Sequence, residues 1–324
     1  MLSKKPLPSF LNYLNLKGIT PVAGDGGHRK YYRLTTPNSS YVLMHDPDIK
    51  AQYKISQKHT FSFVNMYNLF KENNISVPKI EKIFLEESCI LLEDLGDCSL
   101  YSTKDNALQL YKQSLQELIK IQNIKKDINL PMFQSSFDLN FLIQEFTQSL
   151  LSINNFYHSK NLLTSLSKEL VKEIHLFCTF LNQSSFCLVH RDYHSRNIMV
   201  KKQQIKIIDF QDARLGHPLY DLASLLEDPY AKLSCEKKEE LKAYFKKQAS
   251  SLFLNDFNTH YYSISIHRLL KASASFIKLA NNENNKVHNY LIDLPHAVKQ
   301  SYDYVMKLNY PNLQTFIADL YKHK

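Results

Sequence analysis

The residues best suited to chemistry lie in two short stretches of the second half of the chain. The first is His190-Arg-Asp192-Tyr-His-Ser-Arg-Asn197, with the spacing H-x-D-x-x-x-x-N, and the second is Asp209-Phe-Gln-Asp212. Residues 198–208 between them predict a short β-hairpin, which would return the chain and place Asp209 beside Asn197. One aspartate would then accept a proton from a hydroxyl, while the asparagine and the second aspartate hold Mg²⁺ on phosphate oxygens.

Two other interpretations of the first stretch stay open at this point. The spacing can arise by chance in a polar loop, and His190-x-Asp192-x-His194 has the residue types of a metal site. That metal site would need further histidine or cysteine ligands nearby, and the sequence offers only the distant His217. The combination of loop, hairpin and second acidic stretch favours phosphoryl transfer.

A second candidate site is a glycine-rich segment near the N-terminus. Three of the six glycines in the chain, Gly24, Gly26 and Gly27, lie within four residues, between two predicted strands. Glycines let backbone N–H groups approach a phosphate closely, although a plain hairpin turn has the same composition. No G-K-[ST] follows and no helix begins there, so the segment is neither a Walker A motif nor a dinucleotide-binding fingerprint.

Arginine is scarce and clustered near these two sites. The chain has six arginines against 34 lysines; Arg29 and Arg33 flank one short segment, and Arg191, Arg196 and Arg214 fall in another region. Arginine offers phosphate or carboxylate a planar fork that lysine lacks. The placement therefore marks both regions as candidates for binding an anion.

The hydrophobic pattern predicts a mixed region followed by a helical one. The strands of the first region are Ile19–Ala23, Arg29–Thr36, Tyr41–His45, Lys79–Leu85 and Cys89–Glu93, and its helices are 6–16 and Ile49–Glu72. Beyond Gly96, apolar spacings of three and four predict helices over Thr103–Ile124, Phe141–Leu151 and Leu163–Leu181, and again from Pro218 to the end. Short strands at Phe186–His190, Ile198–Val200 and Ile205–Ile208 interrupt them. We expect an α+β protein with a small antiparallel-sheet domain of residues 1–95 and a mainly helical domain of residues 96–324.

Composition excludes several classes of protein. The chain has 324 residues, of which 44% are hydrophobic and 22% charged, so it can bury a core and is not a disordered chain. No apolar run reaches the roughly 20 residues of a membrane span, and no signal peptide is present, so we expect a cytoplasmic protein without membrane contact. The net charge is +9, but lysines alternate with acidic residues, which favours a solvated surface over nucleic-acid binding. The five cysteines form no CxxC pair, and we expect reduced, buried thiols and a monomer.

The chain resembles the aminoglycoside-phosphotransferase and protein-kinase-like superfamily, and within it the bacterial anomeric kinases of N-acetylmuramate and N-acetylglucosamine. The matching stretches run in family order and are GDGGHRKYYRL (24–34), SYVLMHDPD (40–48), ILLEDLGD (90–97), LVHRDYHSRNIMV (188–200) and IIDFQDARLGHPLYDLASLLEDPY (207–230). The resemblance implies a two-lobed protein-kinase-like fold with ATP bound between the lobes. It implies that Asp192 is the catalytic base and that Asn197 and Asp209 bind Mg²⁺. It also implies that Glu93, Asp94 and Leu95 form the hinge beside the adenine.

Several features bear on the substrate. Only 11 residues lie between Asp209 and Asp221, which leaves no room for a protein-kinase activation loop, and Gln211 replaces the glycine of D-F-G. A small acceptor is therefore expected rather than a protein. The lysine that protein kinases carry on the third strand is absent, as it is in the sugar-kinase relatives, so Arg29, Lys30 or Arg33 is expected at the phosphates. The relatives carry Ser or Ala in place of Gly26-Gly27 and Asp in place of His45.

The roles of the remaining polar residues stay open. His194 and Arg196 either contact the γ-phosphate or acceptor or anchor the loop, and Gln211 is a further candidate for substrate contact. Asp212 either binds a sugar hydroxyl or caps a turn, and Asp221 is expected to be a structural cap or a partner of the loop. The resulting hypothesis is an ATP- and Mg²⁺-dependent kinase of the anomeric hydroxyl of N-acetylmuramate or N-acetylglucosamine, in cell-wall sugar recycling. The alternatives are a kinase of another small acceptor (an aminoglycoside, choline or homoserine) and a nucleotide-binding pseudokinase scaffold.

Overall fold

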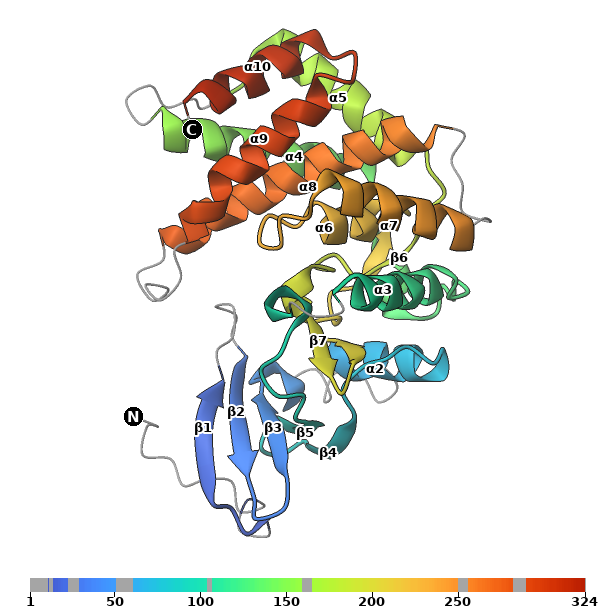
Figure 1. Cartoon of the computed structure of the whole chain (residues 1–324), viewed down its shortest axis with the longest axis vertical. Coiled ribbons are helices and arrows are strands. Elements are labelled where there is room, and N and C mark those ends of the chain that lie inside the picture. The colour runs from blue at the N-terminus through green and yellow to red at the C-terminus, as the bar shows by residue number, and fades with distance from the viewer. Residues whose placement is uncertain are drawn as a thin grey trace.

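The fold separates a β-sheet at one end of the molecule from a group of helices at the other (Figure 1). The computed structural model describes residues 11, 14–22, 29–50, 61–103, 107–158, 165–249, 256–281 and 290–323. Gly24, Gly26 and Gly27, the helix expected over most of 6–16, and residues 51–60 of the helix expected from Ile49 lie outside these ranges. The expected α+β class is confirmed.

The sheet has five antiparallel strands in the order β1-β2-β3-β5-β4. Their bounds are β1 Gly18–Val22, β2 Lys30–Thr35, β3 Ser40–His45, β4 Ile80–Phe84 and β5 Cys89–Glu93. All five coincide with predicted strands. Both faces of the sheet are apolar because alternate residues point to opposite sides. Leu34, Leu43 and Leu91 pack in a small outer cluster, whereas Met44, Ile90 and Leu92 join the main core.

Helix α2 (Ser62–Glu72) buries Phe63, Met66 and Phe70 in the main core, and the rings of Phe63 and Phe70 lie 4.9 and 5.4 Å from that of Phe210. The continuous helix expected over Ile49–Glu72 is wrong at Phe61, which has φ −14° and ψ 128° and is not helical. Phe61 is buried in the main core, and its ring lies 6.4 Å from that of Phe63. Burial of this aromatic ring accompanies the break in a segment whose apolar spacing is helical.

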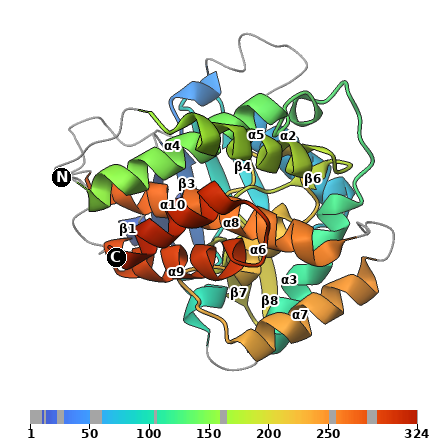
Figure 2. The same cartoon turned by 90° about the horizontal axis from the view of Figure 1, so that it is seen from above.

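The helical part is built from α3 (Ala107–Gln122), α4 (Leu139–Tyr157), α5 (Lys168–Asn182), α6 (Tyr220–Leu226), α7 (Cys235–Gln248), α8 (Phe257–Ala280), α9 (Leu294–Val305) and α10 (Pro311–Lys322). Local signals explain several starts: Asp138, Ser167 and Asp256 accept a backbone N–H from the first turns of α4, α5 and α8. The long α8 crosses the centre of this part, with α9 and α10 on one side of it (Figure 2). None of the described helices is long and apolar enough to cross a membrane.

Two small β elements lie between α5 and α6. Strands β7 (Ile198–Lys201) and β8 (Gln204–Ile207) form the predicted hairpin. Strand β6 (Cys187–Val189) pairs with β9 (Arg214–Gly216), which was not predicted. A Cβ on Gly216 would lie 2.9 Å from Phe137 Cδ2, so only glycine allows β9 to pack against that ring.

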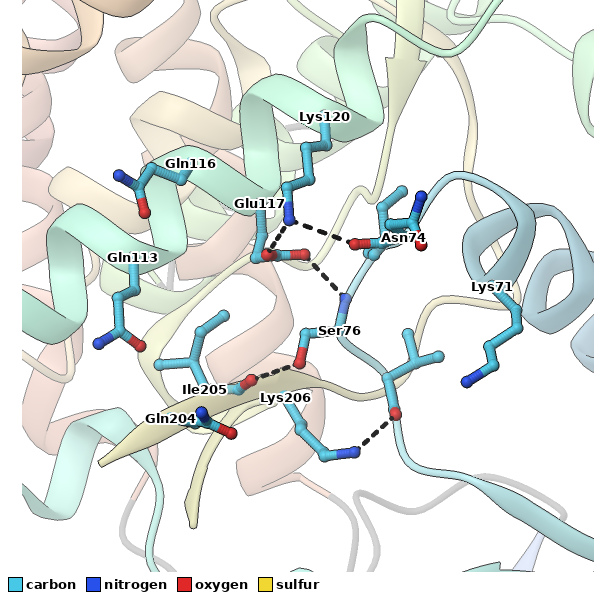
Figure 3. Close-up of a pocket in the computed structure, with 12 residues that line it drawn as sticks. Lys71, Asn74, Ser76, Gln113, Gln116, Glu117, Lys120, Gln204, Ile205 and Lys206 are labelled. Atoms are coloured by element: carbon cyan, nitrogen blue, oxygen red, sulfur yellow. Dashed lines mark hydrogen bonds and ion pairs between the residues drawn. The ribbon is translucent and has the colours of Figure 1, made fainter. Parts of the chain in front are cut away.

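The sheet and the helical part are joined by hydrogen bonds around Ser76, shown with their neighbours in Figure 3. Ser76 N donates to Glu117 Oε2 of α3 (2.8 Å), and Ser76 Oγ donates to the carbonyl of Ile205 in β8 (2.7 Å). Lys120 Nζ binds Glu117 (2.6 Å) and the carbonyl of Asn74 (3.2 Å). The hairpin that follows the candidate catalytic loop is thus fixed to both parts of the molecule.

The division of the chain at residue 95 stays a proposal. It agrees with the end of β5 at Glu93 and with the start of the 3-10 turn Leu100–Ser102 that packs against β7. All five cysteines are free. Cys89, Cys178 and Cys187 are buried as expected, whereas Cys98 and Cys235 are exposed, which corrects the expectation for those two.

Candidate active site

The start of the candidate catalytic loop, residues 190–197, is held by the buried carboxylate of Asp221. Asp221 Oδ2 accepts the N–H of His190 (2.6 Å), and Asp221 Oδ1 accepts that of Arg191 (3.0 Å). Arg191 has a φ of +79°, which costs a non-glycine residue on the order of 1 kcal/mol or more and must be compensated by its surroundings. Asp221 is therefore a partner of the loop, one of the two roles expected for it.

Both ring nitrogens of His190 form hydrogen bonds. Its Nδ1 accepts the N–H of Asp192 (3.3 Å), so Nε2 carries the proton and donates to the carbonyl of Ile208 (3.0 Å). Neither ring nitrogen is left to ligate a metal. The alternative metal site of His190, Asp192 and His194 is therefore not supported, and His190 instead ties the loop to the end of the hairpin.

Two cations from α8 face the carboxylate of Asp192. Lys271 Nζ lies 3.5 Å and an Arg268 guanidinium nitrogen 3.6 Å from Asp192 Oδ1. Burial alone would raise the pKa of Asp192, but the charges of Lys271 and Arg268 outweigh burial and hold that pKa well below its ordinary range. The side chain is still 39% exposed, so an ionised carboxylate is presented to an incoming hydroxyl.

The hairpin brings the second half of the motif back to the loop, as predicted. Ile208 N donates to the carbonyl of Asn197 (3.0 Å), which places Asp209 next to the end of the loop. Asn197 Nδ2 donates to the carbonyl of Asp192 (3.0 Å), and Gln211 Nε2 donates to Asp209 Oδ1 (2.7 Å). Asp209 is exposed and has a φ of +63°, a second strained conformation at the same place.

The donor set at this point fits a magnesium ion. Because Asn197 Nδ2 is used by the backbone, its Oδ1 is the atom that can ligate a cation, and Asp209 adds an exposed carboxylate. Amide and carboxylate oxygens suit a hard cation that keeps several of its waters. Another group of possible metal ligands, His158, Asp319 and His323, lies at the C-terminal ends of α4 and α10, away from this loop in the sequence.

Arg29 and Tyr31 extend the site from the sheet. Arg29 Nε donates to Asp46 (2.8 Å). Burial lowers the pKa of Arg29, but the interactions with Asp46, Tyr31 and Asp212 outweigh burial, so the net shift of the pKa is upward. Burial, reinforced by the charge of Asp209, raises the pKa of Tyr31 to about 12. These interactions show that the start of β2 faces the Asp209–Asp212 segment. Lys30, beside them, is exposed.

The guanidinium of Arg33 is occupied by two carboxylates. Its guanidinium binds Asp94 through Nε (2.8 Å) and Asp97 through both terminal nitrogens (3.0 and 2.9 Å). A phosphate contact would require these pairs to break, and in this structure Arg33 instead holds the segment that contains Asp94 and Asp97. The expected phosphate contact stays a prediction.

Glu93, Asp94 and Leu95, which were expected to form the adenine hinge, are fixed by side chains of the β7–β8 hairpin and of β2. Glu93 binds Lys201 and Lys206 of the hairpin, each at 3.0 Å. Burial would raise the pKa of Glu93, but these lysines lower it to about 2. The carbonyl of Asp94 accepts a bond from Lys201 Nζ (2.8 Å), and Asp94 and Leu95 are buried. The carboxylate of Glu93 is therefore occupied by two lysines of the hairpin.

Arg196, near the end of the catalytic loop, lines a hollow of about 300 Å³. Arg196 stacks on Tyr230, with its Cζ 3.5 Å from the ring centroid, and lies 5.0 Å from that of Tyr101. His194 Nε2 accepts a bond from Asn197 Nδ2 (3.3 Å). His194 therefore supports the loop directly, while Arg196 lines the hollow.

Two acidic residues that follow α6, Glu227 and Asp228, connect the end of the catalytic loop with the helices. Asp228 Oδ2 accepts the N–H of Ser195 (2.9 Å). Its neighbour Glu227 is 1% exposed and binds Lys238 of α7 (2.5 Å), Tyr261 of α8 (2.5 Å), and Gln300 and Tyr304 of α9 (3.0 and 2.7 Å). Four helical side chains thus converge on the residue next to the one that holds the loop.

The groove in Figure 3, of about 580 Å³, contains none of the candidate catalytic residues. The side chains of Ser76, Glu117, Lys120 and Lys206 are used there in bonds that join residues 74–77 to α3 and the hairpin, which gives this part of the groove a structural role. Sequence reasoning missed Lys271, Arg268 and Tyr31 at the site itself. The sequence held one clue to Arg268. The other five arginines lie in the two candidate regions, so the sixth could have been expected near a site as well.

Comparison with known protein sequences gives consistent matches. The pattern of the phosphotransferase enzyme family matches residues 18–251. N-acetylmuramate/N-acetylglucosamine kinase of Pseudomonas aeruginosa is 25% identical over 289 residues, which cover 86% of this chain and 80% of that protein. The protein of the same name from Neisseria meningitidis is 24% identical over 279 residues, covering 81% and 78%.

Solved structures show the same fold at lower identity. Choline kinase LicA from Streptococcus pneumoniae has a TM-score of 0.60 at 14% identity and covers 90% of this chain and 96% of its own. An aminoglycoside phosphotransferase with bound ADP has a TM-score of 0.56 at 13% identity and covers 90% and 95%. The expected two-lobed, protein-kinase-like architecture is confirmed.

Proposed function

The chain belongs to the phosphotransferase enzyme family, and we propose that it transfers the γ-phosphoryl group of ATP to the anomeric hydroxyl of N-acetylmuramate or N-acetylglucosamine. The observation that carries the proposal is the Asp192–Asn197–Asp209 arrangement. It combines an ionised, partly exposed carboxylate with oxygen ligands for Mg²⁺ one hairpin away. The choice of acceptor is supported by the names of the relatives that match more than four fifths of the chain.

Asp192 acts as the base in this proposal. Its carboxylate orients the acceptor hydroxyl and takes its proton as the phosphorus–oxygen bond forms. Lys271 and Arg268 keep the carboxylate ionised but also weaken it as a base. An anomeric hydroxyl suits such a base, because it is more acidic than an ordinary alcohol.

Asn197 Oδ1 and Asp209 would hold Mg²⁺, which supplies positive charge to the phosphate oxygens when bound. The bond from Gln211 to Asp209 and the strained φ of Asp209 orient the carboxylate before the nucleotide arrives. Arg29 and Lys30 would contact the phosphates from the sheet, Arg29 through the part of its guanidinium not bound to Asp46. Backbone groups of Asp94 and Leu95 would bind the adenine.

An acceptor panel with ATP and Mg²⁺, assayed for ADP release, tests the proposal. The panel contains both amino sugars, their methyl glycosides, choline, homoserine and an aminoglycoside. We expect turnover with the free amino sugars, a product that is non-reducing and acid-labile, and no turnover with the methyl glycosides, which lack the anomeric hydroxyl. Phosphorylation of a methyl glycoside at a comparable rate, or preference for choline, would contradict the proposed acceptor while leaving the phosphotransferase class intact.

A further inference from the structure

Two arginines beside the catalytic loop have cationic groups without a partner. Arg191 belongs to the loop, and Arg214 is the first residue of β9, paired with Val189 of β6. The Nε–H groups of both are buried and donate to no acceptor, and among the described residues neither guanidinium forms a hydrogen bond or ion pair. Buried polar groups of folded proteins are nearly always paired, so two such arginines together need an explanation.

Both guanidinium groups are held in place by the same aromatic ring. The Cζ atoms of Arg191 and Arg214 lie 5.5 and 5.7 Å from the centroid of Phe137, and Arg214 is also 5.6 Å from that of Phe141. Phe137 is itself fixed, because its N–H donates to the carbonyl of Leu215 (2.9 Å) and its ring packs 4.9 Å from Tyr220. The two cations are therefore positioned, and are not long side chains free to move apart in water.

The local charge is unbalanced. Burial and the neighbouring charge of Arg191 lower the pKa of Arg214, whereas Asp212 and Glu145 act weakly against them. Neither acid forms an ion pair with Arg191 or Arg214 among the described residues. Two like charges that are partly removed from water favour an anion between them, and a guanidinium fork binds a carboxylate through two parallel hydrogen bonds.

We propose that Arg191 and Arg214 form an oxyanion subsite for the acceptor and bind the carboxylate of N-acetylmuramate. This inference rests on the proposed function and narrows it. Arg191 is adjacent to Asp192 in the chain, and Phe137 and Phe141 belong to the helical part, whereas the nucleotide would contact the sheet and the hinge. The subsite therefore lies on the acceptor side of Asp192. N-acetylglucosamine has no carboxylate and cannot use it.

Three matched acceptors test the subsite in the full-length protein. They are N-acetylmuramate, its methyl ester, which is neutral, and N-acetylglucosamine. For the unmodified chain we expect kcat/KM to be about tenfold or more higher for the acid than for the ester, as expected for one charged hydrogen-bond pair. Arg214→Met should lower kcat/KM for the acid by a similar factor, mainly through KM, and bring the acid-to-ester ratio to within about twofold.

The controls separate the subsite from other effects. Lys278→Met removes an exposed charge from α8 and should keep the acid-to-ester ratio. Arg214→Lys retains the charge without the fork and should give an intermediate ratio. An unchanged ratio in Arg214→Met, or a rise in the KM of ATP in place of the KM of the acceptor, would overturn the inference; the latter would assign the arginines to nucleotide phosphate.

A binding measurement keeps the subsite testable if the enzyme turns over no amino sugar. In that case the proposed function fails, and D-lactate, the acid carried by N-acetylmuramate, is titrated into the protein by calorimetry. The unmodified chain should bind D-lactate at least about tenfold more tightly than Arg214→Met does. Equal binding to both proteins, each verified as folded by its thermal transition, would overturn the subsite.

Discussion

His217 should make the protein lose stability as the solution becomes acidic. The ring is buried, its Nδ1 accepts the N–H of Leu219 (3.1 Å), and its Nε2–H must therefore donate to His260 Nδ1 (3.2 Å). A second proton would have to go to Nδ1, which the backbone N–H occupies. Burial, with a smaller contribution from His260, lowers the pKa of His217 to about 3.

The change of the unfolding free energy with pH follows from the linkage between proton binding and folding. A histidine whose folded pKa is lowered binds fewer protons than it does in the unfolded chain, so the free energy of unfolding falls as pH falls below the unfolded value near 6.5. With a folded value near 3, the free energy of unfolding should drop by about 2 kcal/mol between pH 7 and pH 5. The figure is insensitive to the folded value, provided that value lies well below 5.

Denaturant unfolding at a series of pH values between 5 and 8 measures this effect. His217→Asn is the test variant, because the asparagine Oδ1 can accept the Leu219 N–H and its Nδ2 can donate to His260. We expect this variant to lose about 2 kcal/mol less than the unmodified chain between pH 7 and pH 5. His175→Asn, at an exposed position on α5, is the control and should keep the original dependence. The same pH dependence in His217→Asn and the unmodified chain would refute the reasoning.

Three further predictions concern the site and its support. Asp192→Asn keeps the shape of the side chain but removes the proton acceptor, so kcat should fall by roughly 10²–10⁴ with the KM of ATP nearly unchanged; near-normal turnover would contradict the assignment. Asp209→Ala should abolish turnover and weaken binding of Mg-ATP, measured by nucleotide titration, and unchanged binding would remove Asp209 from the metal site. Glu227→Gln leaves the buried Lys238 without its counter-charge and should destabilise the fold by about 3–5 kcal/mol in denaturant unfolding. Adding Lys238→Met should recover part of that loss, and a single variant with unchanged stability would show that the pair is not needed.

The sequence-based predictions succeeded where the determining information is local. The five strands and the β7–β8 hairpin follow from alternating apolar residues bounded by turn residues, and each was found. The loop and hairpin also predicted that Asn197 and Asp209 would lie close together, because a two-stranded hairpin returns the chain to its starting edge. The break at Phe61 was missed, since its apolar spacing fits a helix.

The predictions failed for contacts made between distant segments. Lys271 and Arg268 lie 79 and 76 residues beyond Asp192 in the chain, and the residue spacing of α8 does not predict that they face that carboxylate. Arg33 was one of three candidates for a phosphate contact, and the sequence did not predict its ion pairs with Asp94 and Asp97, which lie 61 and 64 residues away. Ion pairs of this kind depend on how the elements pack, which residue types and periodicity do not specify.

The adjacent residues Glu227 and Asp228 make assembly of the catalytic loop depend on helices that follow the loop in the chain, from α7 to α9. Asp228 fixes Ser195 of the loop, while Glu227 needs partners from α7, α8 and α9, the last of them Tyr304. A nascent chain that has emerged only as far as α7 would hold the Glu227 carboxylate with Lys238 alone and would lack Lys271 and Arg268 beside Asp192. The proposed phosphoryl transfer would therefore be disfavoured on the ribosome until α9 has emerged, although Asp192 and Asn197 lie more than one hundred residues before Tyr304 in the chain.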